Sequence, residues 1–156
     1  MSDDLYLAFD PGGTTGIAWL ILDKGTHEWR FGCDQVEGRY EAETWAAQTI
    51  GLTDLPTTVI VERWDVRANT HQLTNQDDPR YIIGYLDGIC HALPNVTYVE
   101  QTPAQAKRFA SDDKLKRLGW YEPGKDHARD AARHLLTFLA KDPGPAGIEV
   151  RKGLVQ

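Results

Sequence analysis

Two acidic residues stand in predicted strands. Asp10 ends the first apolar run of the chain, and Glu62 lies within a later run rich in β-branched residues. Burial of an isolated charge costs several kcal/mol, so a carboxylate that interrupts a central strand needs a cation nearby. Side chains alternate between the faces of a strand, so Asp10 shares a face with Ala8, and Glu62 shares one with Ile60. If the two strands are neighbours, Asp10 and Glu62 converge.

A histidine and an aspartate three residues apart, His127 and Asp130, follow later in the chain. On a helix this spacing puts both side chains over the same surface. A helix packed across the sheet could then bring them to Asp10 and Glu62. Carboxylate oxygens are hard ligands that favour Mg²⁺ or Mn²⁺, and two such ions about 3.5 to 4 Å apart can stabilise the attacking and leaving oxygens of a phosphodiester displacement. The four residues therefore predict metal-dependent phosphodiester hydrolysis.

Each residue of the later pair also has a structural explanation. Asp126, directly before the pair, is typical of a helix N-cap. Asp130 alone could pair with Arg133 or His134. His127 alone could be an ordinary surface or core histidine. The combination of residues, rather than any single one, favours a metal site.

The glutamates have alternatives as well. Glu62 alone could be paired by a lysine or by groups around Arg63. Glu100 is a further carboxylate at a strand end, and it is the weaker candidate because its strand is short.

Basic residues concentrate in the last third of the chain. The whole chain has 17 Lys and Arg against 23 Asp and Glu, a net charge of −6. Residues 1–100 carry 6 basic and 16 acidic residues, a balance of −10, whereas residues 101–156 carry 11 and 7, a balance of +4. A local basic cluster can bind phosphates whatever the total charge. A solvated helical surface explains the same charges.

The apolar pattern predicts one α/β domain. The expected elements are strands over 5–10, 16–22 and 27–33, a helix over 40–50, a strand over 57–64, an exposed loop over 67–78, a helix over 81–93, a strand over 95–100, and helices from 103, over 112–118 and over 126–140. Alternating strands and helices favour a five-stranded mixed sheet, three antiparallel strands and then parallel ones, with helices on both faces. We expect this domain to cover residues 1–142 and residues 143–156 to form a loose C-terminal tail.

Length and composition exclude several classes of protein. A chain of 156 residues suits a single domain. Its apolar runs are shorter than the roughly 20 residues that a membrane span needs, and the acidic start is unlike a signal peptide. We therefore expect a cytoplasmic protein with no membrane partner. Cys33 and Cys90 form no CxxC pair, so we expect two ordinary thiols rather than a zinc site or a disulfide.

In this order, the motifs resemble those of the RuvC-type Holliday-junction resolvases, within the RNase H-like superfamily. The segments that carry the resemblance are 7–12, 15–18, 59–62, 69–88 with Arg80 and Gly84, 105–107 with Lys114, and 127–131. Each motif is short, but their order and spacing make the match specific. Small phage-encoded members look most similar, which implies the cytoplasm of a bacterium or of an infected host cell.

The resemblance implies an RNase H-like fold and a Mg²⁺-dependent, structure-specific endonuclease that cleaves branched DNA such as Holliday junctions. Mn²⁺ is expected to substitute for Mg²⁺. The implied metal ligands are Asp10, Glu62, His127 and Asp130, and the implied catalytic residues also include Lys107 and Lys114, facing the scissile phosphate. Two features depart from the family pattern: residues 65–80 contain no aromatic residue, and the net charge is negative.

Resolution of a junction requires two symmetric cuts, so a two-fold homodimer is expected. The predicted helix 81–93 is the candidate interface, because Tyr81, Tyr85 and Leu86 could exceed what one core covers. Packing in the core explains the same residues.

Three other functions fit part of the sequence. Segment 10–16 also resembles the phosphate-binding hairpin of actin-like ATPases and sugar kinases, although that class closes two such domains over a nucleotide and this length supplies one. RNA-processing nucleases of the same superfamily would use Asp10 and Glu62 too. A non-catalytic nucleic-acid-binding or partner-binding module is the third alternative.

Overall fold

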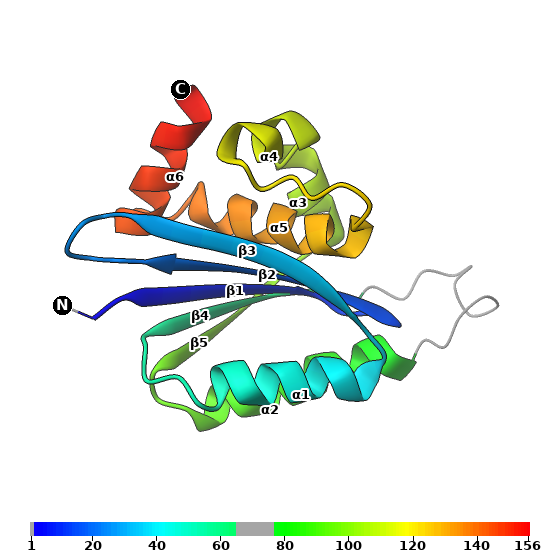
Figure 1. Ribbon diagram of the computed structural model, residues 1–156. Helices are drawn as coiled ribbons and strands as arrows, with labels where there is room; N and C mark the ends of the chain where they lie inside the picture. Colours follow the sequence, from blue (N-terminus) through cyan, green and yellow to red (C-terminus); the bar gives the residue numbers. More distant parts are fainter. Residues whose placement is uncertain (1, 65–76) are drawn as a thin grey trace.

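The computed structural model describes residues 2–64 and 77–156. The described residues contain one five-stranded sheet in the order β3-β2-β1-β4-β5 (Figure 1). β1 (Asp4–Asp10), β2 (Thr14–Leu22) and β3 (Trp29–Glu37) form an antiparallel meander. β4 (Thr57–Glu62) pairs parallel to β1, and β5 (Val96–Gln101) pairs parallel to β4. The predicted five-stranded mixed sheet is confirmed.

Helices cover both faces of the sheet. α1 (Arg39–Ile50) and α2 (Asp77–Ala92) lie on one face, and α5 (Asp126–Leu139) crosses the other (Figure 1). α3 (Pro103–Phe109) packs against α5, and α4 (Asp112–Leu118) packs against α6 (Pro145–Val155). Residues 67–76 of the predicted loop lie outside the described residues, whereas Asp77 and Asp78 belong to α2, which begins four residues before the predicted start at 81.

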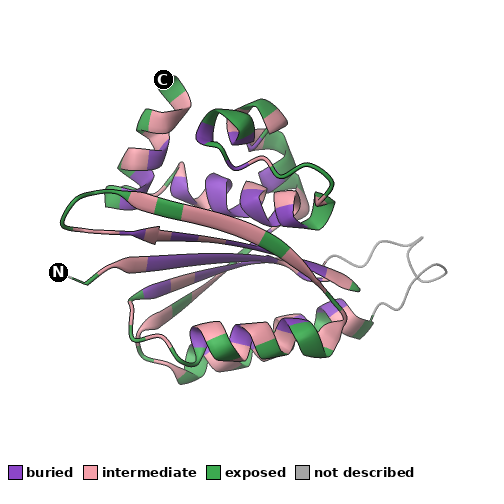
Figure 2. Ribbon diagram, in the orientation of Figure 1, coloured by how far each residue is buried: buried purple, intermediate pink, exposed green. Residues whose placement is uncertain are grey.

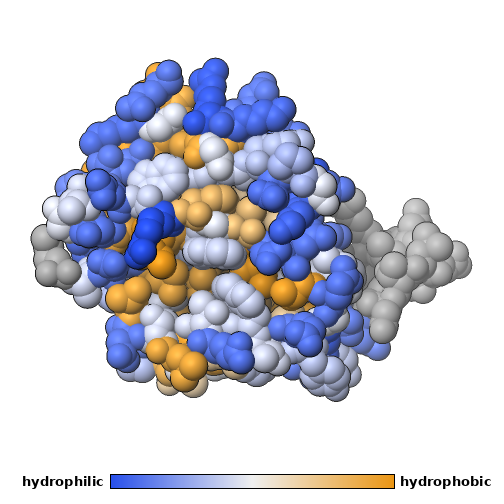
Figure 3. Space-filling view, viewed as in Figure 1, coloured by the Kyte–Doolittle hydropathy of each residue, from blue (hydrophilic) through white to orange (hydrophobic). Residues whose placement is uncertain are grey.

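The sheet separates two apolar cores (Figure 2). Side chains such as Tyr6, Ala8 and Ile60 face α5, whereas Leu7 and Val59 face α1 and α2. This alternation follows from the period of two in each strand. On the face seen in Figure 3, hydrophilic residues cover the outer helices, and apolar groups show mainly between the two helical layers. Among the described residues no helix is both long and apolar enough to cross a membrane.

Local signals explain most element boundaries. Thr102 and Gln105 form a capping box at the start of α3, as the predicted cap before Pro103 requires. The third strand begins later than predicted because the Asp23 carboxylate accepts backbone hydrogen bonds from Gly25 and Thr26, which stabilises a turn there.

The predicted helix cap at Asp126 is wrong. Lys125 occupies the N-cap position and Asp126 is the first helical residue, where its carboxylate pairs with Arg129. A negative charge in the first turn still interacts favourably with the helix dipole, which accounts for the acidic residue at this place.

The chain after residue 142 is not a loose tail. It forms α6, whose Ala146 and Val150 are buried in one core with residues of α4 and α5. Pro145 stands in the first turn of α6. Backbone N–H groups in a first turn have no partner within the helix, so the N–H that proline lacks costs no hydrogen bond there. The expectation of a loose segment is therefore wrong, and the boundary of the nuclease domain at residue 142 stays a prediction.

Only part of α2, the candidate dimer helix, is exposed and so free to contact a second copy of the chain. Leu86 is fully buried in the core and cannot contact a second copy, so its assignment to an interface is wrong. Tyr85 is half-buried against the same core. Tyr81 is 52% exposed, with the Arg39 guanidinium 3.9 Å from its ring centre.

Both cysteines are free thiols, as predicted. Cys33 is half-buried, and Cys90 is buried in the core between the sheet and α2. Burial raises the pKa of the Cys90 thiol to about 12, so this thiol stays protonated at neutral pH.

Candidate active site

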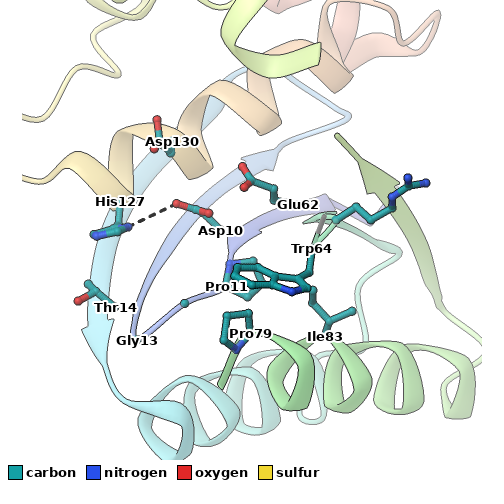
Figure 4. Close-up of a pocket in the computed structure, with 12 residues that line it drawn as sticks. Asp10, Pro11, Gly13, Thr14, Glu62, Trp64, Pro79, Ile83, His127 and Asp130 are labelled. Atoms are coloured by element: carbon teal, nitrogen blue, oxygen red, sulfur yellow. Dashed lines mark ion pairs between the residues drawn. The ribbon is translucent and has the colours of Figure 1, made fainter. Parts of the chain in front are cut away.

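Asp10 and Glu62 end the two central, parallel strands. Phe9 and Val61 are register partners, so the next residues of β1 and β4 reach the same edge of the sheet. Both acidic side chains point toward α5, on the face of Ala8 and Ile60 (Figure 4). The convergence expected from strand periodicity is therefore observed.

The first turn of α5 brings His127 to Asp10. His127 Nδ1 lies 3.5 Å from Asp10 Oδ2. This approach depends on Gly16, the register partner of Asp10 on β2, because a Cβ there would lie 1.8 Å from the His127 carbonyl oxygen. The absence of a side chain at Gly16 lets the helix backbone rest directly on the strand.

The site concentrates negative charge. Burial raises the pKa of the Asp10 carboxyl, and the charges of Glu62 and Asp130 raise it further, while the hydrogen bond from His127 acts in the opposite direction. The same bond with Asp10 raises the pKa of His127. A cation placed among these carboxylates would relieve their mutual repulsion.

Asp130 and Glu62 each have a partner within the protein. The Asp130 carboxylate pairs with Arg133, which also pairs with Asp112. His134 Nε2 lies 2.6 Å from Glu62 Oε2. Of the alternatives considered for Asp130, Arg133 is the observed partner, whereas His134 faces Glu62.

His134 was not among the predicted site residues. It follows Asp130 by four positions and His127 by seven, and this helical spacing places all three on one side of α5. That spacing was the available signal, but nothing local in the sequence links a histidine on α5 to the end of β4.

The four predicted ligands line one pocket. Its volume is about 490 Å³, and Asp10, Glu62, His127 and Asp130 line the side toward α5. Figure 4 shows Pro11, Trp64, Pro79 and Ile83 on the opposite side of the same pocket. One side of the pocket is therefore acidic, and the other is mainly apolar, with Arg63 also in the lining.

The donor set fits a hard divalent cation. Three of the four side chains are carboxylates, which supply the oxygen ligands that Mg²⁺ and Mn²⁺ prefer. Within residues 2–64 and 77–156, however, no three such side chains are gathered closely enough to form a ready metal-binding group. Asp130 is instead paired with Arg133, and Glu62 is paired with His134.

The two predicted lysines lie elsewhere. Lys107 lines a second hollow that shares Asp130 with the first pocket. Lys114 Nζ donates to the carbonyl of Phe109 at 2.8 Å and lies 3.8 Å from the centre of that ring. Neither lysine lines the acidic pocket, and their contact with a phosphate stays a prediction.

No protein-family model matches this chain, and no curated protein is similar to it in sequence. Solved structures do match. RuvC of T. thermophilus, in complex with Holliday junction substrate, matches with a TM-score of 0.61 and 16% identity, over 85% of this chain and 90% of that one.

Two further matches are the fowlpox virus Holliday junction resolvase and the yeast mitochondrial Holliday junction resolvase Ydc2. The first has a TM-score of 0.52 and 13% identity, over 85% of this chain and 93% of that one. The second has a TM-score of 0.53 and 10% identity, over 96% of this chain and 80% of that one. This chain has the fold of the Holliday junction resolvases. The predicted resemblance to that fold is confirmed, while the roles of individual residues in the resolvase fold stay predictions.

Proposed function

We propose that this protein is a structure-specific endonuclease that cleaves branched DNA, such as a Holliday junction, by metal-dependent phosphodiester hydrolysis. One observation carries the proposal: Asp10 and Glu62, from neighbouring strand ends, meet His127 and Asp130 of α5 at one pocket. The likeness to three resolvases, one of them solved with Holliday junction DNA, supports branched DNA as the substrate class.

Asp10, Glu62, His127 and Asp130 would hold a pair of Mg²⁺ ions, with Mn²⁺ as a substitute. When bound, such ions lower the pKa of water and neutralise the leaving oxygen in an in-line displacement. The protein contributes the positions of the ligands: Asp10 is held at the end of a buried strand, 13% exposed, and so has little freedom to turn away.

The basic surface would hold the DNA backbone. Lys107, Arg129 and Arg133 line the hollow beside the acidic pocket, together with Asp112, Asp126 and Asp130. The two arginines are paired with these aspartates, and Lys107 is the remaining cation of the lining. A phosphate chain that enters the acidic pocket would extend across this hollow, where Lys107 and arginines released from their aspartate partners would contact the phosphates. We assign Lys107 and Lys114 to the scissile strand as part of this proposal.

The test is a cleavage assay on a panel of nucleic acids. A fixed four-way DNA junction, a flap, a linear duplex and a structured RNA are each incubated with the protein in Mg²⁺, in Mn²⁺ and in EDTA. We expect cleavage of the junction that depends on the divalent ion. Preferred cleavage of the RNA would favour an RNA-processing nuclease, and absence of cleavage on every substrate would favour a non-catalytic module.

The Asp10→Asn variant tests the assignment of the site. It keeps the shape of the side chain and removes its charge, so we expect cleavage to fall at least about 100-fold while junction binding stays within a few-fold. Cleavage at the wild-type rate in Mg²⁺ would overturn the assignment. Titration calorimetry with Mg²⁺-ATP covers the ATPase alternative, which micromolar binding would support.

A further inference from the structure

The Glu62 carboxylate faces the pocket on one side and the protein core on the other. Its side chain is 21% exposed, and His134 Nε2 lies 2.6 Å from its Oε2 atom. A carboxylate oxygen only accepts hydrogen bonds, so the ring N–H of His134 is the donor. A bond of this kind to an ionised acceptor is roughly twice as strong as a neutral one.

The His134 ring is held from its other side as well. Its Nδ1 atom lies 2.9 Å from the side-chain oxygen of Gln101, which is the register partner of Glu62 on β5. The amide of Gln101 can present either its oxygen or its NH₂ group to the ring. His134 is 1% exposed and Gln101 is 8% exposed, so water does not compete for these bonds. The imidazole therefore bridges two neighbouring strand ends and cannot turn without losing a partner.

This bridge restricts the rotamers of Glu62. A glutamate at a strand end has three rotatable side-chain bonds, and an unbonded carboxylate would sample several directions. With Oε2 bonded to His134, the other oxygen, Oε1, is left for the pocket that Asp10 and His127 also line. Hydrogen-bonded partners of metal-ligating carboxylates act in this way in known metal sites.

We propose that His134 is a positioning residue for Glu62, held in turn by Gln101, and that it sets the affinity of the pocket for a divalent ion. The inference rests on the proposed function, in which Glu62 is a metal ligand. His134 itself does not line the pocket and so does not touch the ion or the DNA.

Two variants separate the two bonds of the ring. The amide nitrogen of a glutamine matches the position of imidazole Nε2, whereas that of an asparagine matches Nδ1. His134→Gln therefore retains a donor toward Glu62, and His134→Asn retains one only toward Gln101. His91, an exposed histidine on α2 away from the pocket, supplies the control variant His91→Asn.

The first measurement is titration calorimetry with Mn²⁺ on the metal-free protein without DNA. We expect His134→Asn to bind Mn²⁺ about 10- to 100-fold more weakly, and His134→Gln to recover most of that affinity. The Mg²⁺ concentration for half-maximal junction cleavage should rise in the same order. Junction binding in EDTA should not change, and His91→Asn should match the wild type throughout.

Thermal unfolding of each variant accompanies the titrations, since a purely structural histidine would change stability alone. Folded His134→Asn protein with wild-type Mn²⁺ affinity would overturn the proposal, as would a wild-type protein that binds no Mn²⁺. If His134→Asn does not fold, Gln101→Met loosens the ring from the far side, and it should weaken Mn²⁺ binding in the same direction. A wild-type protein that binds Mn²⁺ but cleaves no nucleic acid would overturn the proposed function, and the ranking of the variants would still decide the role of His134.

Discussion

At the scale of single residues, surroundings separate two glutamates that look alike in the sequence. Glu62 and Glu100 both stand at the ends of neighbouring parallel strands. Glu62 faces α5, bonds to His134 and lines the acidic pocket, whereas Glu100 is exposed and accepts a hydrogen bond from the Tyr98 hydroxyl at 2.9 Å. The hydrogen bond with Glu100 adds to burial in raising the pKa of Tyr98. Glu100, the weaker ligand candidate of the sequence, does not line that pocket.

This difference predicts that the same substitution, glutamate to glutamine, has a large effect on cleavage at one position and almost none at the other. Glu62→Gln should lower junction cleavage at least about 100-fold, because the proposed site loses one of its charged ligands. Glu100→Gln should leave the rate within about two-fold, because its side chain lies outside the pocket. Single-turnover cleavage of a labelled junction measures both. Equal losses in the two variants would contradict the placement of the site.

At the scale of elements, the close contact between α5 and β2 decides whether the site assembles. The backbone of the first helical turn rests on Gly16, and the same turn carries His127. Protein interiors are packed densely, so a new atom at this contact would have to displace backbone rather than a flexible side chain.

We expect Gly16→Ala to destabilise the fold by at least about 1 to 3 kcal/mol, because the added Cβ overlaps the His127 carbonyl. Junction cleavage by the folded protein should fall as well, since His127 moves away from Asp10. Gly88→Ala on α2 is the matched control: a Cβ added there would meet no atom within 4 Å outside its own helix backbone, and alanine favours a helix by about 0.5 to 1 kcal/mol. Urea denaturation compares the variants. A Gly16→Ala protein with wild-type stability and cleavage would mean that the close contact between α5 and β2 is not required.

At the scale of the whole molecule, the C-terminal helix belongs to the folded core. Val150 of α6 is fully buried with residues of α4 and α5, and the Arg151 guanidinium donates to the carbonyls of Ala140 and Asp142. α6 therefore packs against α4 and α5 and completes the helical layer on that face of the sheet.

Val150→Ala should lower the free energy of unfolding by about 1.5 to 3 kcal/mol, because it removes two buried carbon groups and leaves a cavity. Val155→Ala, at an 84% exposed position of the same helix, should change it by less than about 0.5 kcal/mol. Chemical denaturation measures both values. A loosely attached helix would show no difference between the two variants.

The assembly expected for paired cuts is a two-fold dimer. Tyr81 is the exposed aromatic of α2, and central aromatic residues often dominate interfaces. We expect a dimer in sedimentation equilibrium at micromolar protein, and a dissociation constant about 5- to 30-fold higher for Tyr81→Ser. Leu52→Ser, at an 80% exposed residue outside α2, should leave the constant unchanged. A wild-type protein that sediments only as a monomer would contradict the dimer.

Much of the fold could be predicted because its signals are local. Strand alternation put Asp10 and Glu62 on one face, and the cap at Thr102 and the spacing of His127 and Asp130 marked helices. These features depend on the backbone and on near neighbours, so they can be read before any packing is known.

Only the tertiary structure decided which distant groups meet. The bond between His134 and Glu62 joins residues 72 positions apart, and no local pattern selects His134 over another buried position of the helix. The pairing of Asp130 with Arg133 and the helix after Pro143 were settled in the same way. The physical reason is that a buried polar group takes whichever partner the packed core brings near it, and that partner is determined by the whole arrangement of helices on the sheet.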